Sequence, residues 1–202
     1  MNIAKKQRPI SRAVFTATSE VVTRFSTAGV RHLIAGILGV TALYLSMVTT
    51  SAPMRAVDRA AVDRAIDLLE SQGFGPDATL LRTTATFRSS DNWLNTYLVP
   101  SENAYASTNF PVGIITIYPD FYKKAVDDTE RAMVLLHEAQ HLKGADEREA
   151  YSYVWDNRSK LGWTLNSHGT TESYISIELQ TREYAPEIFT CEEKPFRDCT
   201  EL

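Results

Sequence analysis

The sequence has little cysteine, and outside its first 31 residues it has no excess of positive charge. Its only cysteines, Cys191 and Cys199, lie near the C-terminus, and their spacing does not indicate a metal site. Residues 1–31 carry a formal charge of +5, whereas residues 32–202 carry −9 and the whole chain −4. Residues 32–202, the body of the chain, therefore have no basic stripe that could neutralise phosphates, so we expect no nucleic-acid binding.

Charge of either sign is absent between His32 and Met54. This run is long enough to cross a membrane, because a hydrocarbon core about 30 Å thick needs about 20 helical residues. We expect a basic head over residues 1–31 and a transmembrane anchor over residues 32–54. Two alternatives stay open: a signal peptide cleaved near the small residues 50–52, and a buried core helix.

The basic head also predicts which side of the membrane the body occupies. Positively charged flanks stay in the cytoplasm, so residues 55–202 are expected outside it, in the periplasm or at the cell exterior, or secreted after signal cleavage. An oxidising compartment would favour a disulfide between Cys191 and Cys199. Two unpaired thiols are the alternative.

The body shows no internal repeat, so we expect one domain over residues 55–202. Apolar residues at helical spacing predict helices over residues 55–72, 129–143, 147–160 and 171–184, the last of which also alternates like a strand. Runs of β-branched and aromatic residues predict strands over residues 79–88, 112–118 and, more weakly, 93–99. The predicted fold class is α+β.

The expected helix over residues 129–143 contains an HExxH motif, read HEAQH from His137 to His141. Two histidines four positions apart lie on one helix face, so both imidazoles can bind one zinc ion. Glu138 is offset around the helix, where its carboxylate can reach a water and act as a general base. The alternative for both histidines is a solvated helix surface.

A catalytic zinc site needs a third protein ligand. Asp146 and Glu149 match the N-cap and N3 positions of a capping box, which gives both acids a structural role. Glu147 is then the expected third ligand, because Gly144 lets the chain reverse and bring it back towards the metal. Asp146, Glu149 and His168 remain alternatives as third ligand. The structural alternative for Glu147 is an acid in the first turn of the helix, where the helix dipole favours a negative charge.

Two segments resemble known metallopeptidases. ERAMVLLHEAQH, over Glu130–His141, resembles the active-site helix of zincins, and EREA, over Glu147–Ala150, resembles the ExxA signature of gluzincins. Residues 103–106 and 113–117 are similar to the stretch before the motif in membrane peptidases of the HtpX and CAAX-protease type. The short sequence separation between the motif and Glu147 departs from that type and is similar to the spacing in metzincins. The Met-turn that metzincins have is absent from this chain.

The resemblance implies Zn²⁺ as cofactor, with His137, His141 and Glu147 as ligands and Glu138 as general base. It also implies that residues 103–117 form an edge strand that holds a polypeptide substrate. The donor that stabilises the oxyanion is not identified by the sequence. Candidates are Tyr151, Tyr153, Tyr174, Tyr184 and His168.

These observations predict a membrane-anchored zinc metallopeptidase that hydrolyses peptide bonds outside the cytoplasm. Its α+β, zincin-like domain would pack a small sheet on the HExxH helix. The alternative is a non-catalytic zincin-like domain of the envelope, which binds or scaffolds other proteins and holds a structural zinc ion. The enzyme is favoured because Glu138 does not bind the metal, whereas a purely structural site would normally complete its tetrahedron with protein ligands.

Overall fold

The computed structural model describes residues 11–98 and 104–189 of the chain. The chain divides into two compact units, residues 1–46 and residues 47–202. Within the described residues the first unit is helical, and its helix α1, Ser11–Thr50, reaches the second unit with its last turn. Cys191 and Cys199 lie outside the described residues, as does Asn103.

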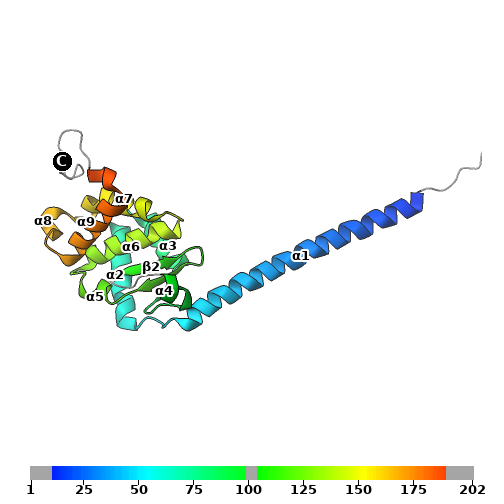
Figure 1. Cartoon of the computed structure of the whole chain (residues 1–202), viewed down its shortest axis with the longest axis horizontal. Helices are drawn as coiled ribbons and strands as arrows, with labels where there is room; N and C mark the ends of the chain where they lie inside the picture. The colour runs from blue at the N-terminus through cyan, green and yellow to red at the C-terminus, as the bar shows by residue number, and fades with distance from the viewer. Residues whose placement is uncertain (1–10, 99–103, 190–202) are drawn as a thin grey trace, which may run out of the picture. The chain divides into compact units, whose positions relative to one another are not determined.

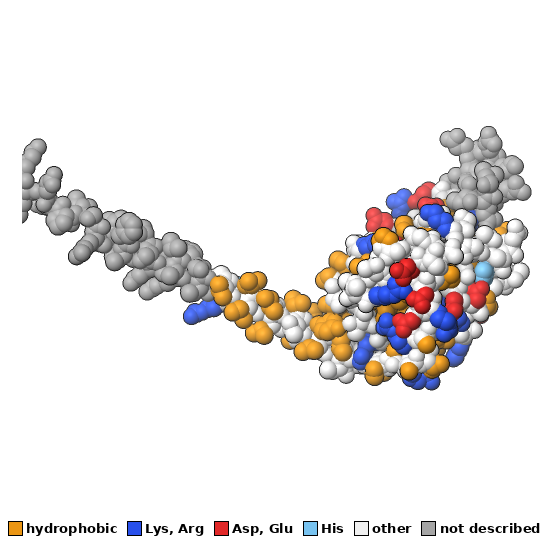
Figure 2. All heavy atoms as spheres, turned by 180° about the vertical axis from the view of Figure 1, so that it is seen from behind, with side chains coloured by type: hydrophobic (Ala, Val, Ile, Leu, Met, Phe, Trp, Pro, Cys, Tyr) orange, Lys and Arg blue, Asp and Glu red, His pale blue; other side chains and the backbone are white. Residues whose placement is uncertain are grey.

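Helix α1 contains a stretch that is long and apolar enough to cross a membrane, Ala28–Thr50. Most of the side chains in this stretch are exposed, and Figure 2 shows many apolar side chains along it. A signal sequence or a core helix would meet the same criteria of length and composition. The helix ends at Thr50, and residues 51–55 lead into the next helix.

Over its described residues the second unit is mostly helical and contains one small sheet (Figure 1). Its helices are α2 Ala56–Ser71, α3 Gly75–Thr84, α4 Trp93–Leu98, α5 Asp120–Lys123, α6 Asp128–Leu142, α7 Glu147–Asn157, α8 Leu165–His168 and α9 Glu172–Tyr184, with 3-10 turns η1 Arg158–Leu161 and η2 Pro186–Phe189. The strands are β1 Thr86–Arg88, β2 Ala106–Asn109 and β3 Ile114–Ile117.

The sheet has the order β1-β3-β2. β1 pairs with β3 in parallel, with Phe87 opposite Ile115, and β2 pairs with β3 antiparallel, with Thr108 opposite Ile115. All four residues of β3 are buried, as expected for a central strand. β2 therefore lies at an edge of the sheet, and it contacts α6.

Two of the strand predictions are wrong over most of their length. Residues 79–84 belong to α3, where Pro76 lies in the first turn and Ala78 and Leu81 are buried at helical spacing. Residues 93–98 form α4, whose first turn is capped because Asn92 Oδ1 accepts hydrogen bonds from two backbone N–H groups. Burial in the first segment and capping in the second outweigh the β-propensity of threonine and the aromatic residues.

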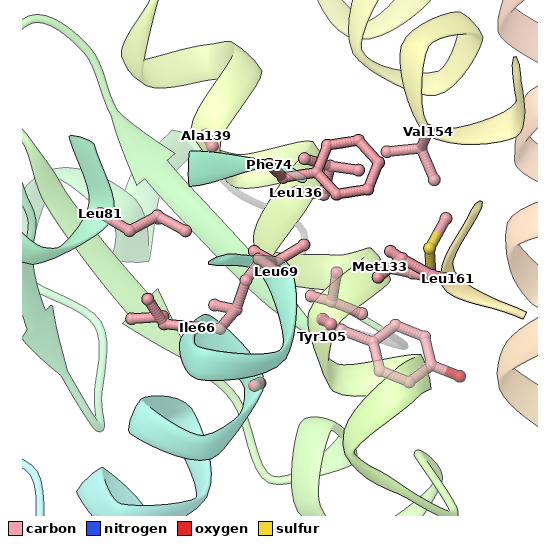
Figure 3. Close-up of a cluster of buried hydrophobic side chains, with 14 of the residues drawn as sticks. Ile66, Leu69, Phe74, Leu81, Tyr105, Met133, Leu136, Ala139, Val154 and Leu161 are labelled. Atoms are coloured by element: carbon pink, nitrogen blue, oxygen red, sulfur yellow. The ribbon is translucent and has the colours of Figure 1, made fainter. Parts of the chain in front are cut away.

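The helix predictions and the strand over residues 112–118 are confirmed within one to three residues, with the fourth turn of the expected 147–160 helix formed by η1. The core lies between α2, α3, α6 and α7. Figure 3 shows Ile66 and Leu69 of α2 facing Met133 and Leu136 of α6. These four side chains are fully buried, so α6 is fixed in the interior and its remaining face is available for a site.

Candidate metal centre

Capping residues fix both ends of α6. Asp127 is the N-cap, and its side chain accepts a hydrogen bond from the backbone N–H of Glu130 at 3.0 Å. Gly144 follows the C-cap with φ of +89°, a conformation that favours glycine. The chain reverses there, so that Glu147 begins α7 beside the last turn of α6.

This reversal brings together the three expected metal ligands. The distance from Nε2 of His137 to Nε2 of His141 is 2.9 Å. Glu147 lies 3.3 Å from Nε2 of His137 through Oε2, and 3.5 Å from Nε2 of His141 through Oε1. One nitrogen of each histidine and one carboxylate oxygen thus lie within 4.8 Å of one another.

The donor set fits zinc. Two imidazole nitrogens and one carboxylate oxygen are ligands that catalytic zinc sites use, and ligand distances of about 2.0–2.2 Å would separate tetrahedral ligands by roughly 3.3–3.6 Å. Nδ1 of His141 lies 2.9 Å from the carbonyl oxygen of Ala145. When Nδ1 donates to that carbonyl, the lone pair of Nε2 points towards the other ligands.

The three side chains also interact strongly without a metal. Hydrogen bonds from His137 and His141 hold the pKa of Glu147 far below its usual range. Burial lowers the pKa of His141, but the hydrogen bond with Glu147 and the charge of Glu138 outweigh it and raise that pKa to about 9. A metal ion that binds here must therefore displace a proton from His141.

Glu138 lies outside this group of ligands. Its side chain is buried, at 4% exposure, and its Oε2 accepts a hydrogen bond of 2.6 Å from Oγ1 of Thr108 in β2. No local pattern in the sequence marks Thr108 as a functional residue. The contact joins residues 30 positions apart and depends on how β2 packs against α6.

A cleft of about 460 Å³ lies over these groups. It is bounded by β2 on one side and by α6, α7 and α9 on the other, and it is lined by His137, Glu138, His141, Glu147, Thr108 and Tyr151 among others. The expected ligands, the expected base and the edge strand therefore face one space. An extended chain of a few residues has room to lie along β2 in this cleft.

The alternative third ligands have other partners. Asp146 accepts from the backbone N–H of Glu149 at 2.9 Å, and the Glu149 carboxylate accepts from the N–H of Asp146 at 3.3 Å, which completes the expected capping box. His168 is buried, and its Nε2 lies 3.0 Å from Oδ2 of Asp127 at the other end of α6. His168 does not line the cleft.

Of the five candidates for the oxyanion donor, Tyr151 alone lines the cleft. Its ring lies 4.4 Å from that of His137, and its hydroxyl donates to Oε1 of Gln180 in α9. Tyr174 is buried against Trp163, whereas Tyr184 stacks on Tyr151 and is 43% exposed. Tyr153, the last candidate tyrosine, lies beneath Lys143, outside the cleft.

Comparison with known families agrees with this geometry. Residues 79–169 match the family model of peptidase family M48, a zincin-like metallopeptidase family. The matched segment runs from α3 to the end of α8 and includes the three strands, the HExxH helix and Glu147. Neither the curated proteins nor the solved structures gave a match. The resemblance to zincin metallopeptidases is confirmed over this segment.

Proposed function

We propose, because residues 79–169 match the family model of peptidase family M48, that this chain is a membrane-anchored zinc metallopeptidase. It would hydrolyse peptide bonds on the extracytoplasmic side of a membrane. The observation that carries the proposal is the convergence of His137, His141 and Glu147 beside the buried carboxylate of Glu138, in one cleft bordered by an edge strand.

His137, His141 and Glu147 would hold the zinc ion. Bound there, zinc would supply Lewis acidity, which polarises the scissile carbonyl and makes water a stronger acid near neutral pH. Glu138 would accept the proton of the attacking water and deliver it to the leaving amine. Thr108 holds Glu138 through one oxygen, which leaves the other oxygen for this proton transfer.

The substrate would bind as an extended polypeptide along β2. β2 is an edge strand of the described sheet, and Ala106, Ser107 and Thr108 line the cleft. Backbone pairing with an edge strand aligns a peptide independently of its side chains. This is the zincin-like arrangement that we propose for the domain, with the sheet packed on α6. Tyr151 is the candidate donor that lines the cleft, and its hydroxyl would turn from Oε1 of Gln180 to stabilise the oxyanion.

The proposed organisation is a cytoplasmic head over residues 1–31, an anchor over residues 32–54 and a peptidase domain over residues 55–202. The apolar stretch Ala28–Thr50 of α1 and the positive charge that precedes it support this order. The partners that follow are a polypeptide substrate and a lipid bilayer.

The test uses the full chain, purified in detergent, and measures zinc content and cleavage of a peptide library. We expect one zinc ion per chain and cleavage by the wild type. The matched control is Glu138→Gln, which should keep zinc and lose cleavage, because it removes the base and no ligand. Stoichiometric zinc with no cleavage by the wild type would instead support the alternative, a binding or scaffolding domain with structural zinc.

A further inference from the structure

The last turn of α1 belongs to the second unit, where Arg88 of β1 holds it by hydrogen bonds. Nη2 of Arg88 donates to the carbonyl oxygen of Val48 at 2.7 Å and also to the carbonyl of Ser51, and its Nε donates to Oγ of Ser51 at 2.9 Å. A guanidinium at the end of a helix satisfies carbonyls that have no partner within the helix. The last turn of α1 is therefore fixed to the body.

Residues that follow β1 form further hydrogen bonds with the C-terminal end of α1 and the residues just after it. Ser90 Oγ accepts a hydrogen bond of 2.8 Å from the backbone N–H of Ala52, and the N–H of Ser89 donates to the carbonyl of Ala52 at 3.0 Å. The backbone N–H of Trp93 donates to Oγ1 of Thr50 at 3.3 Å. The first residue of α4 thus lies directly at the last residue of α1.

Helix α4 has a buried polar face and an exposed aromatic face. Asn92, its cap, and Asn95 are fully buried, and their side-chain amides donate to Asn109 at 2.8 Å and to Thr116 at 3.2 Å. These bonds fix the orientation of α4 on the sheet. Trp93 and Tyr97, four positions apart, are 41% and 84% exposed on the outer face.

Trp93 is far more exposed than the other tryptophans of the chain. The other two tryptophans, Trp155 and Trp163, are buried at 1% and 0% exposure. Tryptophan and tyrosine are enriched at the boundary between bilayer and water, where the ring enters the headgroup region and the polar atom stays hydrated. An aromatic pair beside the end of a membrane-crossing helix lies at that depth.

We propose that Trp93 and Tyr97 form a lipid-binding surface that inserts into the headgroup region of the bilayer crossed by α1. This inference rests on the membrane anchor in the proposed function, and it adds a second contact between the catalytic domain and the membrane. The partner is the interfacial zone of the bilayer. The hydrogen bonds of Arg88, Ser89 and Ser90 hold the surface at the point where the chain leaves the bilayer.

The experiment measures tryptophan fluorescence of the full chain in phosphatidylcholine vesicles, with acyl chains brominated close to the headgroup or left unmodified. We expect bromination to quench a large part of the wild-type emission. In Trp93→Phe this quenching should be lost, because the two remaining tryptophans are buried in the protein core. Vesicle flotation of the same samples measures anchoring independently.

A reporter elsewhere on the domain provides the position control. Leu165→Trp in the Trp93→Phe background adds an exposed tryptophan on α8, which lies on the opposite side of the second unit from α4 in Figure 1. This reporter should stay unquenched. Equal quenching of Trp93 and the α8 reporter would overturn a specific surface at α4.

Two further outcomes separate this inference from the proposed anchor. If the chain floats with the vesicles and bromination leaves the wild-type emission unchanged, the lipid-binding surface is wrong and the anchor stands. If the chain does not float, the proposed anchor is wrong, and the lipid-binding surface, which depends on that anchor, is wrong as well.

Discussion

At the scale of single residues, two neighbouring acids have different environments. Glu147 faces the two histidines, whereas Asp146 caps α7. We predict that Glu147→Ala loses most of its zinc affinity, because a ligand is removed from a three-ligand site. Asp146→Ala should keep zinc and lower the free energy of unfolding by about 0.5–2 kcal/mol, the usual cost of a lost cap.

Zinc stoichiometry and the unfolding midpoint, measured on the same preparations, separate these two variants. If Asp146→Ala lost zinc and Glu147→Ala retained it, Asp146 would be the zinc ligand and Glu147 would not. The resemblance of residues 147–150 to the gluzincin ExxA signature would then carry no functional meaning.

A second residue-scale prediction concerns Thr108, which acts through Glu138. Thr108→Val removes the hydroxyl that holds the carboxylate and keeps the shape of the side chain. We expect kcat to fall roughly ten-fold, equivalent to about 1.4 kcal/mol, with KM and zinc content nearly unchanged. Thr108→Ser keeps the hydroxyl and should restore most of the activity. Equal kcat values for wild type and Thr108→Val would refute this positioning role.

The charge pair in the metal-free site predicts a pH dependence. The pKa of His141 is raised from 6.5 to about 9, so its stabilising contribution is complete below pH 6.5 and disappears as the pH rises to about 9. The pKa of Glu147 is lowered from 4.5, so its contribution is present above pH 4.5 and declines below it. We expect the thermal unfolding midpoint of the metal-free protein to decrease as the pH rises from 6.5 to 9.

Zinc changes this dependence, because binding must release the proton on His141. Calorimetric titration near pH 7.5 in buffers of different ionisation enthalpy should show proton release. Glu147→Gln serves as the control for the metal-free midpoint, since loss of the carboxylate removes the main cause of the raised pKa of His141. A metal-free midpoint that stays constant from pH 6.5 to 9 would show that His141 is neutral there.

At the scale of elements, α3 is joined to the C-terminal half of α6 by a buried acid. Asp77 is 3% exposed, and its Oδ1 accepts from Nε2 of Gln140 at 2.9 Å and from Nζ of Lys143. Asp77→Ala should lower the free energy of unfolding by about 1–3 kcal/mol, because the partners left behind are partly buried. Chemical denaturation in detergent measures this loss.

Arg82 on the same helix provides the matched control. It pairs with Asp67 and Glu70, whose side chains are 70% and 56% exposed. Arg82→Ala should cost less than about 1 kcal/mol, because exposed ion pairs are screened by water. If the two variants were equally destabilised, burial would not explain the contribution of Asp77.

At the scale of the whole molecule, the charge asymmetry predicts the topology. A reporter that works only in the cytoplasm should be silent when fused after Leu202 and active when fused before Met1, because basic flanks stay inside. A strong signal from the C-terminal fusion would place the catalytic domain in the cytoplasm. The mass of the mature chain distinguishes an uncleaved anchor from a signal peptide cleaved near residues 50–52.

The sequence by itself determined the features that are local in the chain. The HExxH spacing places His137 and His141 on one helix face, and the capping pattern separates Asp146 and Glu149 from Glu147. These relations depend on helix geometry and on hydrogen bonds within one turn, so a short segment specifies them. Zinc binding by the group is still a prediction.

The tertiary structure decided the features that depend on contacts between distant segments. Residues 79–84 are helical because burial outweighs intrinsic propensity, and residues 93–98 are helical because capping does. The contact between Thr108 and Glu138 and the placement of Tyr151 on His137 require β2 and α7 to pack on α6. Such packing depends on burial across the whole core, which local sequence patterns do not contain.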